Sequence, residues 1–108
     1  MLNLNDRVLI KEGGIAFNIG LVKEIEGTII GLDKGTLQPY LVAFKKKDIK
    51  NNTFDGLSIF YNYLSPLKER LGWANETISN IEGFLGDEDE YLALWIDEKK
   101  ILKKLLTN

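Results

Sequence analysis

The sequence of 108 residues contains no cysteine and no histidine. Without cysteine there are no disulfides, no thiolate nucleophiles and no zinc–thiolate sites. Without histidine the chain lacks the commonest general base and the commonest metal ligand. Serine–histidine and cysteine–histidine catalysis are therefore excluded. A phosphate-binding loop and a Gly-x-Gly-x-x-Gly motif are also missing, so we expect no enzyme activity, no catalytic residues, no cofactor and no metal ion.

The chain also has little excess charge and no long apolar run. Its 14 basic and 16 acidic residues leave a net charge of −2, which argues against a general polyanion binder. No apolar run approaches the ~20 residues of a membrane span. The first residues have neither the basic start nor the apolar stretch of a signal peptide. We expect a cytoplasmic protein without a membrane partner.

Residues 1–64 carry the signals of short strands separated by turns. The clearest strand lies within residues 38–45, where Tyr40, Val42 and Phe44 alternate with Leu41 and Ala43. Further alternating or β-branched runs lie at residues 6–12, 15–26, 28–32 and 57–61, with turn signals such as Gly13-Gly14 and Asp33-Lys34-Gly35 between them. Five short strands in about 60 residues predict a small all-β barrel.

The residues that define this layout carry a family resemblance. They are Asn5-Asp6-Arg7-Val8, the glycine-bearing loop from Gly13 to Gly20, Gly27-Thr28-Ile29-Ile30, Tyr40-Leu41-Val42-Ala43-Phe44, and the run from Phe60 to Leu67. This layout resembles the SH3-like barrel group in its KOW or Tudor-like form, as found in short phage and bacterial proteins. The resemblance implies a five-stranded antiparallel barrel over residues 1–64. It leaves the ligand open, since this fold hosts binders of proteins, peptides and nucleic acids.

Residues 65–108 carry helix signals instead. Ser65 is a suitable N-cap and Pro66 suits the first helical position. An apolar seam at spacings of three and four follows, made of Leu67, Leu71, Ala74, Ile78, Ile81 and Leu85. Gly86 is a natural stop, and Asp87 with Glu90 resembles a capping box. The pattern predicts an antiparallel helical hairpin with helices at about 66–85 and 88–106, and hence an α+β fold of a barrel followed by a hairpin.

Two groups of side chains are candidates for binding. The basic stretch Lys45, Lys46, Lys47 and Lys50 could contact the phosphates of a nucleic acid, or it could simply be a solvated hairpin tip. A protein-binding surface could instead use aromatic side chains, which dominate interface energetics. The candidates are Phe17, Tyr40, Tyr61 and Trp73.

The last predicted helix has a broad apolar stripe that could pair with a second copy of the chain. Its members are Tyr91, Leu94, Trp95, Ile101, Leu102 and Leu105. A homodimer through the C-terminal helices is therefore an expectation.

The sequence favours a role in binding over a role in catalysis. Its small size and its asparagine-, lysine- and isoleucine-rich composition resemble those of small accessory proteins of phages and other mobile elements. This resemblance implies a non-catalytic protein-interaction module that inhibits a host or defence protein, such as a CRISPR effector nuclease, by binding it. The alternatives are a KOW-like nucleic-acid-associated module and a structural virion or scaffold component.

Overall fold

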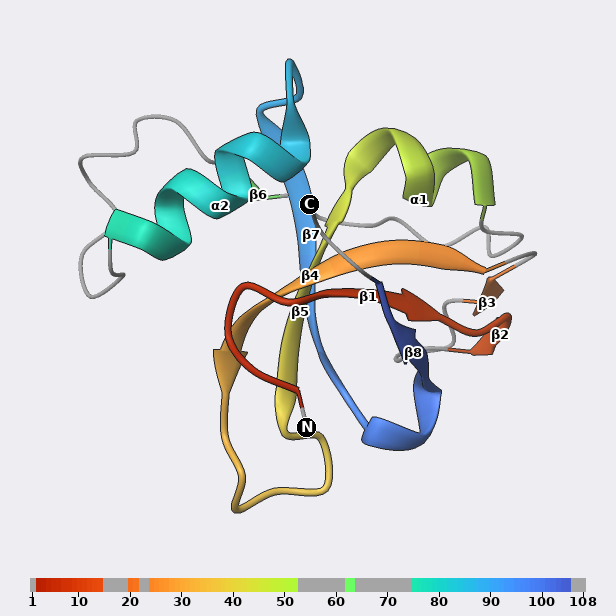
Figure 1. Ribbon diagram of the computed structural model, residues 1–108. Coiled ribbons are helices and arrows are strands. Elements are labelled where there is room, and N and C mark those ends of the chain that lie inside the picture. The colour runs from red at the N-terminus through yellow and green to blue at the C-terminus, as the bar shows by residue number, and fades with distance from the viewer. Residues whose placement is uncertain (1, 15–19, 22–23, 53–61, 64–74, 106–108) are drawn as a thin grey trace.

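The structure, a computed structural model, describes residues 2–14, 20–21, 24–52, 62–63 and 75–105 (Figure 1). Phe17, Tyr61 and Trp73 lie outside these residues, as does the 66–74 part of the first predicted helix. The elements are β1 (Arg7–Ile10), β2 (Gly13–Gly14), β3 (Gly20–Leu21), β4 (Ile25–Leu32), β5 (Tyr40–Lys45), α1 (Lys46–Asn52), β6 (Asn62–Tyr63), α2 (Asn75–Leu85), β7 (Glu90–Ile96), the 3-10 helix η2 (Glu98–Lys100) and β8 (Ile101–Lys104).

One antiparallel sheet organises the described residues. Its strand order is β6-β7-β5-β4-β1-β8, and β2 pairs with β3 in a separate two-stranded ribbon. Five strands of the main sheet have four or more residues, and β6 adds two residues at one edge. The sheet is open, with β6 and β8 at its two edges, so the predicted closed barrel is wrong. The described fold is mainly β.

The predicted C-terminal helical hairpin is also wrong. Over the described residues 88–105 the chain forms β7, the short η2 and β8 instead of one long helix. β7 lies beside β5 in a register of six residue pairs, from Tyr40↔Ile96 to Lys45↔Tyr91. After η2, β8 pairs with β1. The run from Tyr91 to Ile96 has apolar residues on both alternating faces, which also fits helical spacing over so short a segment. Backbone pairing with β5, 46 or more residues earlier in the chain, decides the outcome.

The first face of the sheet carries the larger core. Alternate residues of β1, β4, β5 and β7 meet there, and α1 adds Ile49. The buried members are Val8, Ile10, Ile25, Ile29, Val42, Phe44, Ile49, Leu92, Leu94 and Ile96.

The opposite face is covered by α2 (Figure 1). Ile81, Phe84 and Leu85 of this helix pack with sheet residues Ile30, Ala43 and Tyr91. The sheet therefore buries both of its faces, and apolar residues follow one another along β5 and β7 instead of alternating with polar ones.

The end of α2 agrees with the helix stop that the sequence predicts at Gly86. The helix ends at Leu85, and Gly86 takes a φ of 63°, the left-handed conformation that favours glycine after a helix. Its backbone N–H donates to the Glu82 carbonyl at 2.9 Å. The second half of the predicted helix seam and its stop are confirmed over the described residues.

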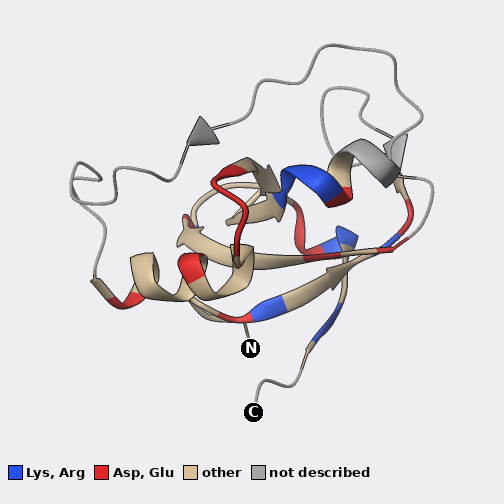
Figure 2. Ribbon diagram, turned by 90° about the horizontal axis from the view of Figure 1, so that it is seen from above, with Lys and Arg blue, Asp and Glu red and all other residues tan. Residues whose placement is uncertain are grey.

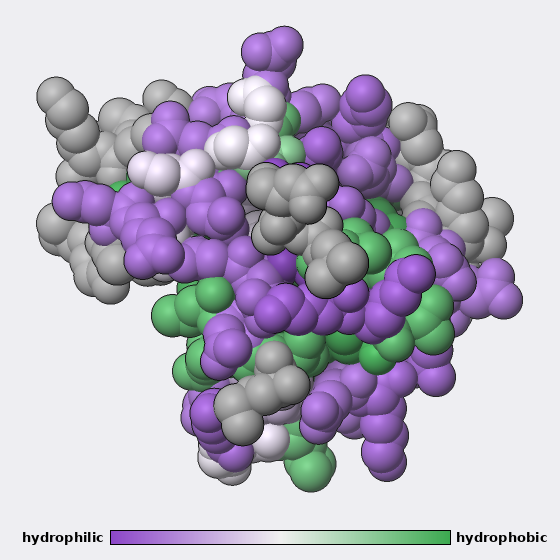
Figure 3. All heavy atoms as spheres, viewed as in Figure 1, coloured by the Kyte–Doolittle hydropathy of each residue, from purple (hydrophilic) through white to green (hydrophobic). Residues whose placement is uncertain are grey.

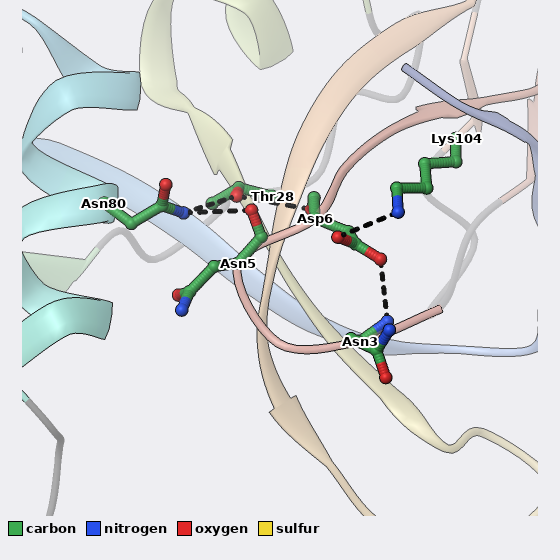
Figure 4. Close-up of polar contacts among 6 residues, drawn as sticks. All are labelled: Asn3, Asn5, Asp6, Thr28, Asn80 and Lys104. Carbon is green, nitrogen blue, oxygen red and sulfur yellow. Dashed lines mark hydrogen bonds and ion pairs between the residues drawn. The ribbon is translucent and has the colours of Figure 1, made fainter. Parts of the chain in front are cut away.

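A polar contact fixes α2 against the sheet (Figure 4). The Asn80 side-chain amide donates to the Thr28 hydroxyl at 3.1 Å and to the Asn5 carbonyl at 3.3 Å. Thr28 is fully buried, so its hydroxyl needs a partner inside the protein. Asn5 adopts a φ of 72°, which asparagine tolerates better than most residues. This contact ties α2, β4 and the N-terminal segment together.

Replacing Asn80 by alanine is expected to destabilise the protein by about 1–3 kcal/mol, because the buried Thr28 hydroxyl and the partly buried Asn5 carbonyl lose their donor. Urea unfolding measures the change. The exposed neighbour Ser79 on the same helix provides the control, and Ser79→Ala should stay within about 0.5 kcal/mol of the parent protein. Equal effects of the two substitutions would show that the Asn80 contact contributes nothing.

Two glycines should respond oppositely to the same substitution. A Cβ at Gly27 would lie 2.9 Å from Phe44 Cε1 and 3.0 Å from the Ala43 carbonyl oxygen, so Gly27→Ala should cost about 1–3 kcal/mol by overpacking. At Gly83, inside α2, a Cβ meets nothing within 4 Å. Gly83→Ala should therefore stabilise the helix by up to about 1 kcal/mol. Thermal or urea unfolding of both variants checks the sign of each effect.

Candidate functional site

Strands β4 and β7 end at the same level of the sheet, where β5 between them begins. Leu32, Tyr40 and Ile96 are aligned across β4, β5 and β7. Beyond them the Asp33 backbone N–H donates to the Pro39 carbonyl at 2.8 Å, which closes the β4–β5 turn over residues 33–39. Asp97 directly follows β7 at the same level.

Asp33 organises this turn. Its carboxylate accepts from the Gly35 N–H at 3.4 Å, and its carbonyl accepts from both the N–H and the hydroxyl of Thr36. This is the local bonding that aspartate makes in turns. The predicted Asp33-Lys34-Gly35 turn is confirmed.

One residue further into the sheet, the indole of Trp95 extends across the strands. Gly31, Leu41 and Trp95 are aligned across β4, β5 and β7. A Cβ at Gly31 would lie 3.6 Å from Trp95 Cη2 and 3.1 Å from Leu41 Cβ. The ring thus reaches from β7 over Leu41 to the glycine on β4, and Trp95 remains 40% exposed.

The β4–β5 turn adds a second exposed apolar side chain. Leu37 is 89% exposed, the highest value among the large exposed apolar residues. A hollow of about 580 Å³ lies between the turn and the end of β7, and we call it the Trp95 hollow. Its lining residues are Asp33, Thr36, Leu37, Gln38, Trp95 and Asp97. In Figure 3 apolar atoms reach the surface at the lower tip of the molecule, where the β4–β5 turn lies.

The charged groups of the Trp95 hollow are both carboxylates. Asp33 and Asp97 line it, and none of the described lysines and arginines does. Asp97 uses one carboxylate oxygen to accept from the Lys99 N–H at 3.0 Å, which caps η2. The hollow therefore combines an exposed aromatic ring, an exposed leucine and negative charge.

The candidate lysines occupy a different part of the molecule. Residues 46–52 form α1, so the predicted hairpin tip is wrong. Lys45 Nζ lies 5.1 Å from the centre of the Phe84 ring, and Lys46 forms an ion pair with Glu90. Lys47 is exposed, and the side chain of Lys50 is not among those that the structure describes. Figure 2 shows basic segments interrupted by acidic ones. Two of the four candidate lysines thus contact the protein's own side chains.

The predicted aromatic and dimer residues divide by burial. Tyr40 is half-buried beside the first core. Tyr91 and Leu94 are buried in opposite faces of the sheet, and Ile101 and Leu105 are half-buried. Of the proposed stripe, Trp95 and Leu102 are exposed. Because the described stripe residues lie on β7 and β8 or directly after β8, the second C-terminal helix, which was to carry the dimer stripe, is wrong.

Sequence reasoning missed Leu37, Asp33 and Asp97 as site residues. The available signal was a lone leucine in a polar turn, but its proximity to Trp95 depends on the pairing of β5 with β7.

Other kinds of site find no support among the described residues. The described residues contain no cluster of three or more acidic side chains that could hold a metal ion. Within the same residues, no helix is long and apolar enough to cross a membrane. No family model, curated protein or solved structure matches the chain.

A comparison of two leucines tests whether Leu37 has a structural role. Leu37→Ala should change the free energy of unfolding by less than about 0.5 kcal/mol, because the side chain is exposed. The same substitution at Leu94, which is 8% exposed, should cost about 2–5 kcal/mol. Urea unfolding measures both. A large loss for Leu37→Ala would mean that this leucine stabilises the fold.

Proposed function

We propose that this protein is a non-catalytic protein-interaction module that binds its partner through the Trp95 hollow. The observation that carries the proposal is that an exposed indole and an exposed leucine line one hollow at the end of a sheet that has a buried core on each face. Tryptophan is enriched among residues that dominate binding energy at protein interfaces. Leu37 is 89% exposed and so buries little apolar surface against the described fold, and partner binding gives its side chain a role.

The resemblance to small phage and mobile-element proteins extends this proposal to the partner. On that resemblance, the partner is a host or defence protein in the cytoplasm, such as a CRISPR effector nuclease, that is inhibited when the module occupies its surface. The fold resemblance to SH3-like proteins likewise stays a proposal. A homodimer is a further proposal, and sedimentation at high protein concentration tests it.

The proposal predicts which exposed apolar residues matter for binding. In affinity capture with the tagged chain, Trp95→Ala and Leu37→Ala should each weaken recovery of the specific partner roughly tenfold or more. Leu102 on β8 is 50% exposed and does not line the hollow, and Leu102→Ala is the matched control that should retain full capture.

Folding of each variant is verified by circular dichroism and urea unfolding. Unchanged capture by Trp95→Ala and Leu37→Ala would contradict the proposed surface. A gel shift with nucleic acid at low and moderate salt tests the competing function, since binding to phosphates should fall steeply as salt rises.

A further inference from the structure

We infer that the Trp95 hollow recognises an arginine side chain of the partner, which stacks on the indole of Trp95 and pairs with the carboxylates of Asp33 and Asp97. This inference rests on the proposed function and names the chemistry of the partner. It follows from the charge of the hollow, the placement of its carboxylates and the shape of the ring surface.

The negative charge of the Trp95 hollow favours a cation as its ligand. Two of the six lining residues are acidic and none is basic. Lys34 lies in the same turn and Lys99 in η2, but neither lines the hollow. Asp33 and Asp97 each use one carboxylate oxygen in the turn or the helix cap, and their other oxygens have no hydrogen bond to a described residue. An exposed indole beside negative charge attracts cations both through the ring quadrupole and through the carboxylates.

The strand register sets the spacing of these groups. Asp33 and Asp97 follow the aligned residues of β4 and β7, with β5 between them. Two strand spacings place their backbones about 10 Å apart. Gly31 and Trp95 each lie two residues before one of these aspartates, so the indole crosses the sheet about 7 Å further along the strands. A cation that enters between the carboxylates therefore reaches the ring.

This arrangement favours arginine over lysine. The guanidinium group is planar, stacks on aromatic faces and presents five N–H donors in a fixed fork, whereas the lysine ammonium is a compact point charge. The planar group can lie along the indole and still donate to carboxylates on two sides. The exposed Leu37 offers an apolar surface for the aliphatic stem of the same side chain.

The test uses a blocked pentapeptide with a central arginine between glycines, and the same peptide with citrulline, the neutral isostere of arginine. The two peptides have the same shape, so the difference between them reports the charge. Binding is followed by NMR through the indole N–H resonance of Trp95. The chain has two tryptophans, and the resonance that disappears in Trp95→Phe identifies the correct one.

The arginine peptide should shift the Trp95 resonance saturably, and the citrulline peptide should bind at least tenfold more weakly. Asp33→Asn and Asp97→Asn should each weaken the arginine peptide roughly three- to fivefold, as expected for an exposed ion pair. Asparagine retains the acceptor that each turn or cap requires, so both variants should fold. Asp87→Asn, an exposed acid in the turn after α2, should leave binding unchanged. Equal binding of the two peptides, or no effect of either Asn variant, would overturn the inference.

The two proposals can fail separately. If Trp95→Ala and Leu37→Ala still capture the partner, the hollow is not the binding surface, and both proposals are overturned. If those variants lose the partner while Asp33→Asn and Asp97→Asn capture it normally at low salt, the Trp95 hollow is supported as the binding surface. The inference that it recognises an arginine is then overturned. Loss of capture in all four variants, together with preference for the arginine peptide, supports both.

Discussion

The burial of strand β5 on both of its faces is the constraint on which the rest of the structure depends. Val42 and Phe44 enter one core and Ala43 the other, and all three are fully buried. A central strand of this kind needs neighbours on both edges and cover on both faces. β4 and β7 supply the edges, α2 covers one face, and α1 contributes to the core on the other. The chain therefore brings its C-terminal part back to the middle of the sheet.

Among the described elements, the cover that α2 gives to its face of the sheet ends before the sheet does. The helix has 11 residues and packs near Ile30 and Ala43. It is held there by apolar contacts, by the Asn80 hydrogen bonds and by Phe84, whose ring receives Arg7 and Lys45 at 5.5 and 5.1 Å. At the far end of the strands the indole of Trp95 is the cover instead. The proposed binding surface lies at that end, where no described element covers the apolar side chains of Leu37 and Trp95.

The sequence reveals the local elements of this fold better than its long-range pairing. The strand at residues 40–45, the turn at Asp33 and the helix end at Gly86 all have signals within a few residues. The sequence predicts a helix over residues 88–106 because the run from Tyr91 to Ile96 satisfies both a helical and a strand period. Only pairing with β5 distinguishes the two. The candidate site was missed for the same reason, since its residues come from two segments about 60 positions apart in the chain.

The bulge in β4 connects the fold to the proposed site. The register between β4 and β5 shifts between Ile29 and Gly31, so Ile30 is an extra residue. Ile30 packs under α2, and Gly31 follows it on the same face beside Leu41 and Trp95. A regular strand would turn residue 31 toward the other face and bring a different residue to this position. The extra residue thus serves the α2 core, and the glycine next to it leaves the space in which the indole crosses the sheet. Helix packing and the shape of the Trp95 hollow therefore depend on the same irregularity.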